Sequence, residues 1–599
     1  MSETYSELFN RIYKLIQNKD IPKATALIQN LMTKNKNDIN LYHLLGIAHF
    51  QDGKIGDAIK CLEKAVQLGA KDPELLNNLG NFYKFNNQLH QAERAYKQAF
   101  EVHPSYLSPK QGLLSVLVMQ KKYSECKKSV EKFLLQHPTN SSFHGVSGDL
   151  YRHDSHWEKA ELSYQKAIKH GVGKSLAAYL NNLGLIYLEL CEFEKAKQSF
   201  SKCLEIDSSK PEPIYNLSTS LYELGDYESA QRLLEQIISS FPRYQLAHKS
   251  INEIYYQTNQ LHLYGSTYQK FLYEIEFDEY FAIEYLKCLL KKNDLLEVRK
   301  SIDSFGGIQS KHLNILMAEY YEKIGNANLS KSLYQSLTLE ENSPSVTLKY
   351  VEYLIRNEYL EDAEAIMRKY FDVSETDSQL ALAYYSVIWK KTQAGNYNWL
   401  CDYNKFVKEF SLFDFGYSTE DLSQLKVYLL SIHPNLREPS NQSVRGGSQI
   451  PGKLLNRNSK EIKKLRQSLE EILKNYMLSL PSDSTHPFLR RNTGKCSIVG
   501  SWSIKLTPGG YHQSHIHSDG WLSSAVYIEV PEFNEFDKNG SLFLGRSPSS
   551  LIPNDNSDLD VNPTRGSVVL FPSYFWHGTD KFLGPSFRIT TPFDAVPIQ

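Results

Sequence analysis

Three histidines near the C-terminus have the residue type and spacing of a metal site. His515 and His517 are two residues apart, and side chains at positions i and i+2 of a strand share one face, so we expect both imidazoles to point the same way. His577 follows about sixty residues later and is expected to bring a third imidazole from a distant strand. Two or three such ligands leave other coordination positions open, as a non-haem Fe(II) centre that activates O2 requires.

A carboxylate competes with His515 for the place of the near ligand. If the strand continued, Asp519 would share a face with His517, and the site would consist of His517, Asp519 and His577. Asp519 also precedes Gly520, and an Asp-Gly pair is a common turn signal. Since a carboxylate would lower the charge of an iron site by one unit, the two sets differ in metal affinity and potential.

A second group of residues follows His577 and suits a carboxylate ligand. Arg588 offers two parallel N–H donors, and Thr590, two residues on, shares its strand face and can donate a further hydrogen bond. This pair would hold the far carboxylate of a keto acid. Tyr527 and its neighbour Val526 would point to opposite faces of a strand. Two interpretations stay open for Tyr527, a hydrogen bond to the keto acid and packing within the barrel.

The elements around these residues are predicted to be short strands. Runs rich in β-forming residues cover 495–507, 522–530, 540–545, 567–572 and 587–593, separated by turn signals. We therefore predict a β-barrel core over residues 495–599. Residues 396–494 are expected to form a helical and loop extension of it, with a polar loop at 437–453 and an amphipathic helix at 459–479.

The first part of the chain repeats with a period of 34 residues. Gly46, Ala58 and Ala65 recur as Gly80, Ala92 and Ala99, which is the tetratricopeptide pattern of paired helices. Small residues let the two helices approach, and large aromatic residues fill the adjoining groove. We predict a helical lead-in at 1–38, clear repeats at 39–250 and degenerate helical repeats at 251–395, together an α-solenoid.

Composition limits the kind of partner and the compartment. Lys and Arg number 67 against 68 Asp and Glu, which gives a formal charge of −1 and no general field for nucleic acid or an anionic membrane. The seven cysteines are scattered without a Cys-x-x-Cys pair, as is typical of a reducing compartment. No export signal and no membrane span are evident, so we expect a soluble, cytoplasmic protein whose repeats bind a protein or peptide.

The motifs of the C-terminal third resemble those of the 2-oxoglutarate- and Fe(II)-dependent dioxygenase superfamily, and in particular a group of oxygenases often fused to tetratricopeptide repeats. The residues that carry the resemblance span about 399–593 and are Asn398-Trp399, Asp402-Tyr403, Gln442, Arg445, Gln449, Trp502, His515-Ile516-His517, Leu522 to Tyr527, Leu570-Phe571-Pro572, His577 and Arg588.

The resemblance implies a double-stranded β-helix of the jelly-roll or cupin-like kind, so the whole chain would be an α + β multidomain protein. It further implies binding of Fe(II), 2-oxoglutarate and O2, with oxidative decarboxylation to succinate and CO2. His577 matches the distal metal ligand and Arg588 the co-substrate arginine. The narrower group has His-x-His followed by Pro, and this chain departs from that pattern only in having Ser518 at the Pro position. Because the His-x-His pair is present and Asp519-Gly520 is a turn signal, we favour His515, His517 and His577 as ligands, with Asp519 as the rival.

Two other functions remain open at this stage. The chain could be a tetratricopeptide scaffold with a non-catalytic barrel, or a three-His metal oxygenase that does not use 2-oxoglutarate. The joint presence of His517, His577 and Arg588 argues against a decayed barrel, and Arg588 with Thr590 has no evident role without a keto acid.

Overall fold

The structure is a computed structural model that describes residues 4–305, 310–341, 343–433, 443–450, 452–531, 540–582 and 586–598. The chain divides into two compact units. One unit contains residues 1–186 and 201–207, and the other contains residues 187–200 and 208–599, so the chain passes between them within two consecutive helices.

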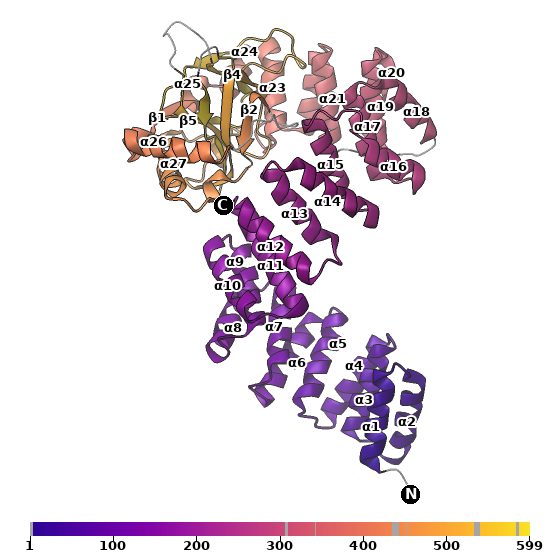
Figure 1. The fold of residues 1–599 in the computed structure, drawn as a ribbon. Helices are drawn as coiled ribbons and strands as arrows, with labels where there is room; N and C mark the ends of the chain where they lie inside the picture. The colour runs from indigo at the N-terminus through magenta and orange to yellow at the C-terminus, as the bar shows by residue number, and fades with distance from the viewer. Residues whose placement is uncertain are drawn as a thin grey trace. The chain divides into compact units, whose positions relative to one another are not determined.

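The first unit is built from helices that follow one another as antiparallel hairpins (Figure 1). Its helices are α1 (Tyr5–Gln17), α2 (Ile21–Lys34), α3 (Ile39–Gln51), α4 (Ile55–Gln67), α5 (Pro73–Phe85), α6 (Leu89–Val102), α7 (Leu107–Met119), α8 (Tyr123–Gln136), α9 (Ser141–His153) and α10 (Trp157–His170). The two helices shared between the units are α11 (Gly173–Glu189) and α12 (Phe193–Ile206).

The repeat pattern acts through close packing between paired helices. Gly80 of α5 faces the Tyr96 ring of α6, and a Cβ at residue 80 would lie 2.6 Å from that ring. Gly148 of α9 stands in the same relation to Tyr164 of α10, at 2.7 Å. The buried tyrosine hydroxyls donate back to the partner helix, Tyr96 to Asn81 Oδ1 at 2.7 Å. The predicted helical repeats are therefore confirmed, because the small residues stand where the aromatic rings need space.

The second unit continues with helices and ends in a sheet domain. Its helices before the sheet are α13 (Pro211–Glu223), α14 (Tyr227–Ser240), α15 (Gln245–Gln257), α16 (Ser266–Glu274), α17 (Glu279–Lys292), α18 (Leu295–Ser304), α19 (Lys311–Lys323), α20 (Ala327–Glu341), α21 (Pro344–Arg356), α22 (Leu360–Tyr370), α23 (Gln379–Thr392), α24 (Ala394–Leu400) and α25 (Tyr403–Phe406). Two further helices, α26 (Thr419–Ser431) and α27 (Lys460–Ser479), and the 3-10 turns η1 (Leu412–Phe415), η2 (Leu454–Asn456) and η3 (Leu489–Arg491) lie between its first strands.

The sheet curls on itself as two layers of antiparallel strands, which is the expected double-stranded β-helix. Its strands are β1 (Lys408–Ser411), β2 (Val444–Ile450), β3 (Cys496–Ser501), β4 (Ser503–His515), β5 (Leu522–Glu529), β6 (Leu542–Leu544), β7 (Leu559–Val561), β8 (Ser567–Pro572), β9 (His577–Thr579), β10 (Arg588–Thr590) and β11 (Phe593–Pro597). One layer follows the order β1, β8, β5, β11, β3, and the other contains β2, β10, β4, β9, β6 and β7; β10 also pairs with β5 and joins the layers.

Helices cover the outside of the sheet and share its core. A single cluster of buried apolar residues runs from Ala318 in α19 to Ala595 in β11. The indole of Trp576 donates to the carbonyl of Ala383 in α23 at 3.1 Å, and Tyr476 of α27 donates to the carbonyl of Phe406 at 2.7 Å. Trp576 thus ties α23 to the segment between β8 and β9, and Tyr476 ties α27 to α25. Both α23 and α27 lie beside the strands (Figure 1).

Three details differ from the sequence-based expectation. A polar loop was expected at 437–453, and this prediction was wrong for residues 444–450, which form β2 and pair with β4. Residues 437–442, which include Gln442, and residue 451 lie outside the described residues. Gly446 and Gly447 make this strand hard to recognise, yet they allow its close approach, because a Cβ at Gly447 would lie 2.5 Å from the Lys505 carbonyl oxygen. The runs expected at 495–507 and 587–593 are each two strands, β3 with β4 and β10 with β11, and the short strands β1 and β7 were not expected.

Among the described residues, none of the helices combines the length and apolar character needed to cross a membrane.

Candidate metal centre

A cavity of about 620 Å³ opens inside the curled sheet. All of the residues predicted from the sequence to bind metal or keto acid line it, namely His515, His517, Asp519, Tyr527, His577, Arg588 and Thr590. These side chains come from β4, the turn after it, β5, β9 and β10, so the fold brings together residues up to 75 positions apart.

Three imidazoles meet at one side of this cavity. His515 is the last residue of β4 and lies opposite His577, the first residue of β9, in the antiparallel register. His517 follows two residues after the strand ends, and one ring nitrogen from each histidine lies within 4.8 Å of the others. Nε2 of His515 and Nε2 of His517 are only 3.1 Å apart.

The outer ring nitrogens are all hydrogen bonded away from this meeting point. Nδ1 of His515 donates to the carbonyl of Gln513 and Nδ1 of His577 to the carbonyl of Phe575, each at 2.8 Å. A carbonyl only accepts, so both histidines carry their proton on Nδ1 and leave Nε2 as a bare lone pair. Nδ1 of His517 lies 2.6 Å from both carboxylate oxygens of Asp594.

Burial keeps the imidazoles of His515 and His577 neutral. Desolvation, with a further contribution from His517, lowers the pKa of His515 to about 3. Desolvation also holds the pKa of His577 well below its ordinary value, and His515 and His517 add to the effect. Neutral imidazole is the form of histidine that binds metals.

This donor set fits a divalent metal ion. Two lone pairs 3.1 Å apart repel each other unless something electropositive lies between or beside them. Three imidazoles with outer nitrogens fixed by acceptors are the arrangement that protein metal sites use to orient histidine ligands. The residues present therefore match the group that the resemblance implies.

Asp519 occupies a different position from the histidines. Strand β4 ends at His515, and Asp519 lies in the exposed turn before β5, as its Asp-Gly signal indicates. Its carboxylate is not among the atoms that gather within 4.8 Å of one another, although it lines the cavity. The choice of His515, His517 and His577 as ligands remains a prediction, and the convergence of their ring nitrogens supports it.

The Arg588 end of the cavity has buried donors without a matching acceptor. Arg588 is 2% exposed, and its Nη1 donates to the carbonyl of Gly540 at 2.6 Å. Its Nε and the buried hydroxyl of Tyr527 have no hydrogen-bond partner among the described residues. Within that part of the chain no carboxylate lies within 4.0 Å of the guanidinium, and desolvation lowers its pKa. Burying a cation in this way is costly, so the cavity favours an anionic ligand at this end.

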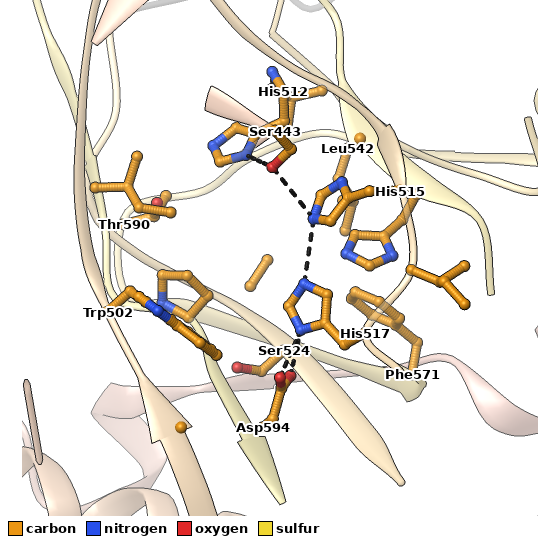
Figure 2. A pocket seen from close by; sticks show the side chains of 18 of the residues that line it. Ser443, Trp502, His512, His515, His517, Ser524, Leu542, Phe571, Thr590 and Asp594 are labelled. Carbon is orange, nitrogen blue, oxygen red and sulfur yellow. Dashed lines mark hydrogen bonds and ion pairs between the residues drawn. The ribbon is translucent and has the colours of Figure 1, made fainter. Parts of the chain in front are cut away.

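Several polar residues of the cavity, among them Ser443, His512 and Asp594, were not recognised as cavity residues from the sequence. Figure 2 shows a chain of close polar contacts from His512 through Ser443, His515 and His517 to Asp594, in which the Nε2 atoms of His515 and His517 face each other. Ser443 comes from the segment before β2, and its hydroxyl lies 3.1 Å from His512 Nδ1 and 3.3 Å from His515 Nε2. Asp594 had a detectable signal, since a carboxylate between the apolar residues Phe593 and Ala595 of a buried strand requires a partner.

Comparison with known families identifies both regions. Residues 39–71, 73–106, 177–210 and 214–244 match tetratricopeptide repeat models. Residues 500–594, which contain the whole cavity lining apart from Ser443, Gln449 and Val499, match the family described as "Putative 2OG-Fe(II) oxygenase". The chain thus has a tetratricopeptide repeat region followed by a domain of this oxygenase family, as the sequence motifs predicted, and the family description indicates an oxidoreductase.

Curated relatives match only part of the chain. Intraflagellar transport protein 70A of Danio rerio is 27% identical over 188 residues, which are 31% of this chain and 28% of that protein. Protein O-mannosyl-transferase TMTC3 of Homo sapiens is 22% identical over 241 residues, 37% of this chain and 26% of that protein. The chain therefore spans only about a quarter of the length of these two relatives.

Among solved structures, a tetratricopeptide repeat protein from Parabacteroides merdae ATCC 43184 is similar to this chain. The two are 19% identical with a TM-score of 0.31, and the match covers 45% of this chain and all of the other.

Proposed function

We propose that the C-terminal domain is an Fe(II)- and 2-oxoglutarate-dependent dioxygenase and that the helical repeats recruit its substrate, a protein or another large molecule. One observation carries the proposal: one cavity of about 620 Å³ holds three converging imidazoles and a buried arginine that has no carboxylate partner among the described residues. The first group suits a metal ion, and the second suits a ligand with a carboxylate.

His515, His517 and His577 would hold Fe(II) through Nε2, since their outer nitrogens are already engaged. When bound together with O2, iron and 2-oxoglutarate supply oxidative decarboxylation to succinate and CO2, coupled to oxidation of a C–H bond of the substrate. Three histidine ligands would leave further coordination positions of the metal for the co-substrates.

Arg588 would orient the keto acid by pairing with its far carboxylate. In the part of the chain that the structure describes, Nε of Arg588 and the hydroxyl of Tyr527 have no hydrogen-bond partner, and the guanidinium carbon lies 5.6 Å from the Tyr527 ring centre. Thr590 lines the cavity two residues further along β10. These neutral and cationic donors would fix one end of the dianion while excluding water from it.

The repeats support the recruiting role, because arrays of paired helices commonly bind proteins or peptides. A chain with this role would use the array for recognition and the cavity for chemistry. We propose the cytoplasm as its compartment from the scattered, free cysteines.

Calorimetry tests the proposed chemistry. The Mn(II)-loaded protein should bind one equivalent of 2-oxoglutarate, and the metal-free protein should bind it at least about tenfold more weakly, because the metal and Arg588 hold opposite ends of it. Metal binding without any 2-oxoglutarate binding would favour the three-His oxygenase that uses no keto acid. Absence of both would favour a scaffold with a non-catalytic barrel.

A further inference from the structure

Asp594 is a buried carboxylate with one dominant partner. It lies on β11, its side chain is 8% exposed, and both of its oxygens lie 2.6 Å from Nδ1 of His517 (Figure 2). Among the described residues, no Lys or Arg side chain lies within ion-pair distance of it. The carboxylate has therefore been removed from water to face one imidazole.

This contact distinguishes His517 from the other two histidines. His515 and His577 each donate Nδ1–H to a neutral backbone carbonyl, whereas His517 faces an anionic acceptor. A carboxylate at Nδ1 draws the ring proton toward itself and makes Nε2 a stronger electron donor. A cation at Nε2 would in turn strengthen the Nδ1–H donor, so each partner stabilises the other.

The surroundings fix Asp594 in this position. Ser523 donates to its Oδ1 at 2.8 Å and also lies 2.9 Å from the hydroxyl of Ser573. Ser573 in turn accepts the backbone N–H of His517 at 3.1 Å through its carbonyl. A side chain at Gly520 would overlap Ser573 Oγ, so the glycine leaves room for this network. The carboxylate, the histidine and the turn between β4 and β5 are therefore held as one group.

Three neutral imidazoles alone would leave a divalent ion with its full charge in a buried cavity. We propose that Asp594 is a positioning residue that supplies, through His517, the negative charge that a directly bound carboxylate provides in a His-x-Asp site. The inference rests on the proposed metal site and adds that its affinity and electronic properties depend on a residue that does not touch the metal.

Cobalt(II) is the probe for this proposal, because it reports both affinity and ligand field. Under anaerobic conditions the Co(II) dissociation constant is measured by competition with a chelator, together with the visible d–d spectrum. Asp594→Asn keeps the shape and a neutral acceptor but removes the charge, so Co(II) should bind about 10- to 100-fold more weakly with a shifted spectrum. Asp594→Glu should restore part of the affinity. Asp414→Asn removes an exposed aspartate of the same domain and should change neither quantity.

Ser523→Ala gives a second route if Asp594→Asn does not fold. It keeps the carboxylate and removes one hydrogen bond to it, so Co(II) affinity should fall about two- to tenfold with a smaller spectral shift in the same direction. An affinity within twofold of wild type and an unchanged spectrum in the folded Asp594 variants, or in Ser523→Ala, would overturn the inference. Failure of the wild-type protein to bind Co(II) would overturn the proposed metal site itself.

Discussion

The helical repeats and the cavity of the C-terminal domain use their residues in opposite ways, since the repeats reuse one contact and the cavity does not. In the repeats one packing solution recurs, a glycine against a tyrosine ring, at Gly80 with Tyr96 and again at Gly148 with Tyr164. In the cavity each side chain occupies a different position and contributes a different contact, and Arg588 is the one arginine among the described residues that line it. Damage to one repeat should therefore be local and graded, whereas damage to the cavity should remove a function outright.

The largest difference is expected when a cavity histidine is removed. His577→Ala should abolish stoichiometric Fe(II) binding, because only two of the three imidazole ligands remain. The helical signal in far-UV circular dichroism should be unchanged. Iron content after anaerobic loading and gel filtration is the measurement. His433, a buried histidine hydrogen bonded to Ser448 and Ser503, provides the matched control, and His433→Ala should still bind one iron. Full iron occupancy in His577→Ala would remove this residue from the site.

The near ligand can be decided by a pair of variants. His515→Ala should lose most Fe(II) affinity, and Asp519→Ala should retain it, since the His515 imidazole lies beside His517 and the Asp519 carboxylate lies in the exposed turn. Iron titration of both variants under identical conditions gives the comparison. The reverse order would assign the site to His517, Asp519 and His577.

Arg588 separates co-substrate binding from metal binding. Arg588→Ala would leave a desolvated carboxylate without its partner, a loss of about 2–5 kcal/mol, so 2-oxoglutarate affinity should fall at least about tenfold. Arg588→Lys keeps the charge without the two-donor geometry and should lie between. Fe(II) should still bind to both variants. Unchanged 2-oxoglutarate affinity in calorimetry would show that another cation, or no keto acid, is used.

The smallest effect at the cavity is expected from changes in the repeats. Gly80→Val would force a side chain into the Tyr96 ring and should lower the free energy of unfolding by about 1–3 kcal/mol without changing Fe(II) affinity. Gly56 in α4 has no neighbour within 4 Å of its Cβ position, so Gly56→Ala should be neutral or slightly stabilising. Thermal unfolding and iron titration measure the two properties. A loss of iron affinity in Gly80→Val would contradict the separation.

The same contrast explains how much could be predicted from the sequence. Each copy of a repeated pattern supports the interpretation of the others. The helical pairs were therefore predictable, including the helices at 251–395, where the 34-residue pattern is degenerate. The histidines and Arg588 were identifiable by residue type and spacing. Strand β2 was not predicted, because Gly446 and Gly447, which allow close packing against β4, interrupt the alternation by which a strand is recognised. Ser443 and Asp594 could not be assigned to the cavity, because their roles depend on contacts with residues 72 and 77 positions away.

The most direct test is an anaerobic titration of the purified protein with Fe(II) and 2-oxoglutarate, followed in the visible spectrum. A bidentate keto acid on Fe(II) gives a metal-to-ligand charge-transfer band that neither component gives alone. The account predicts this band at one equivalent of each, and its loss in His577→Ala. No band at saturating Fe(II) and 2-oxoglutarate, in protein that binds iron, would contradict the claim that this cavity holds the two together.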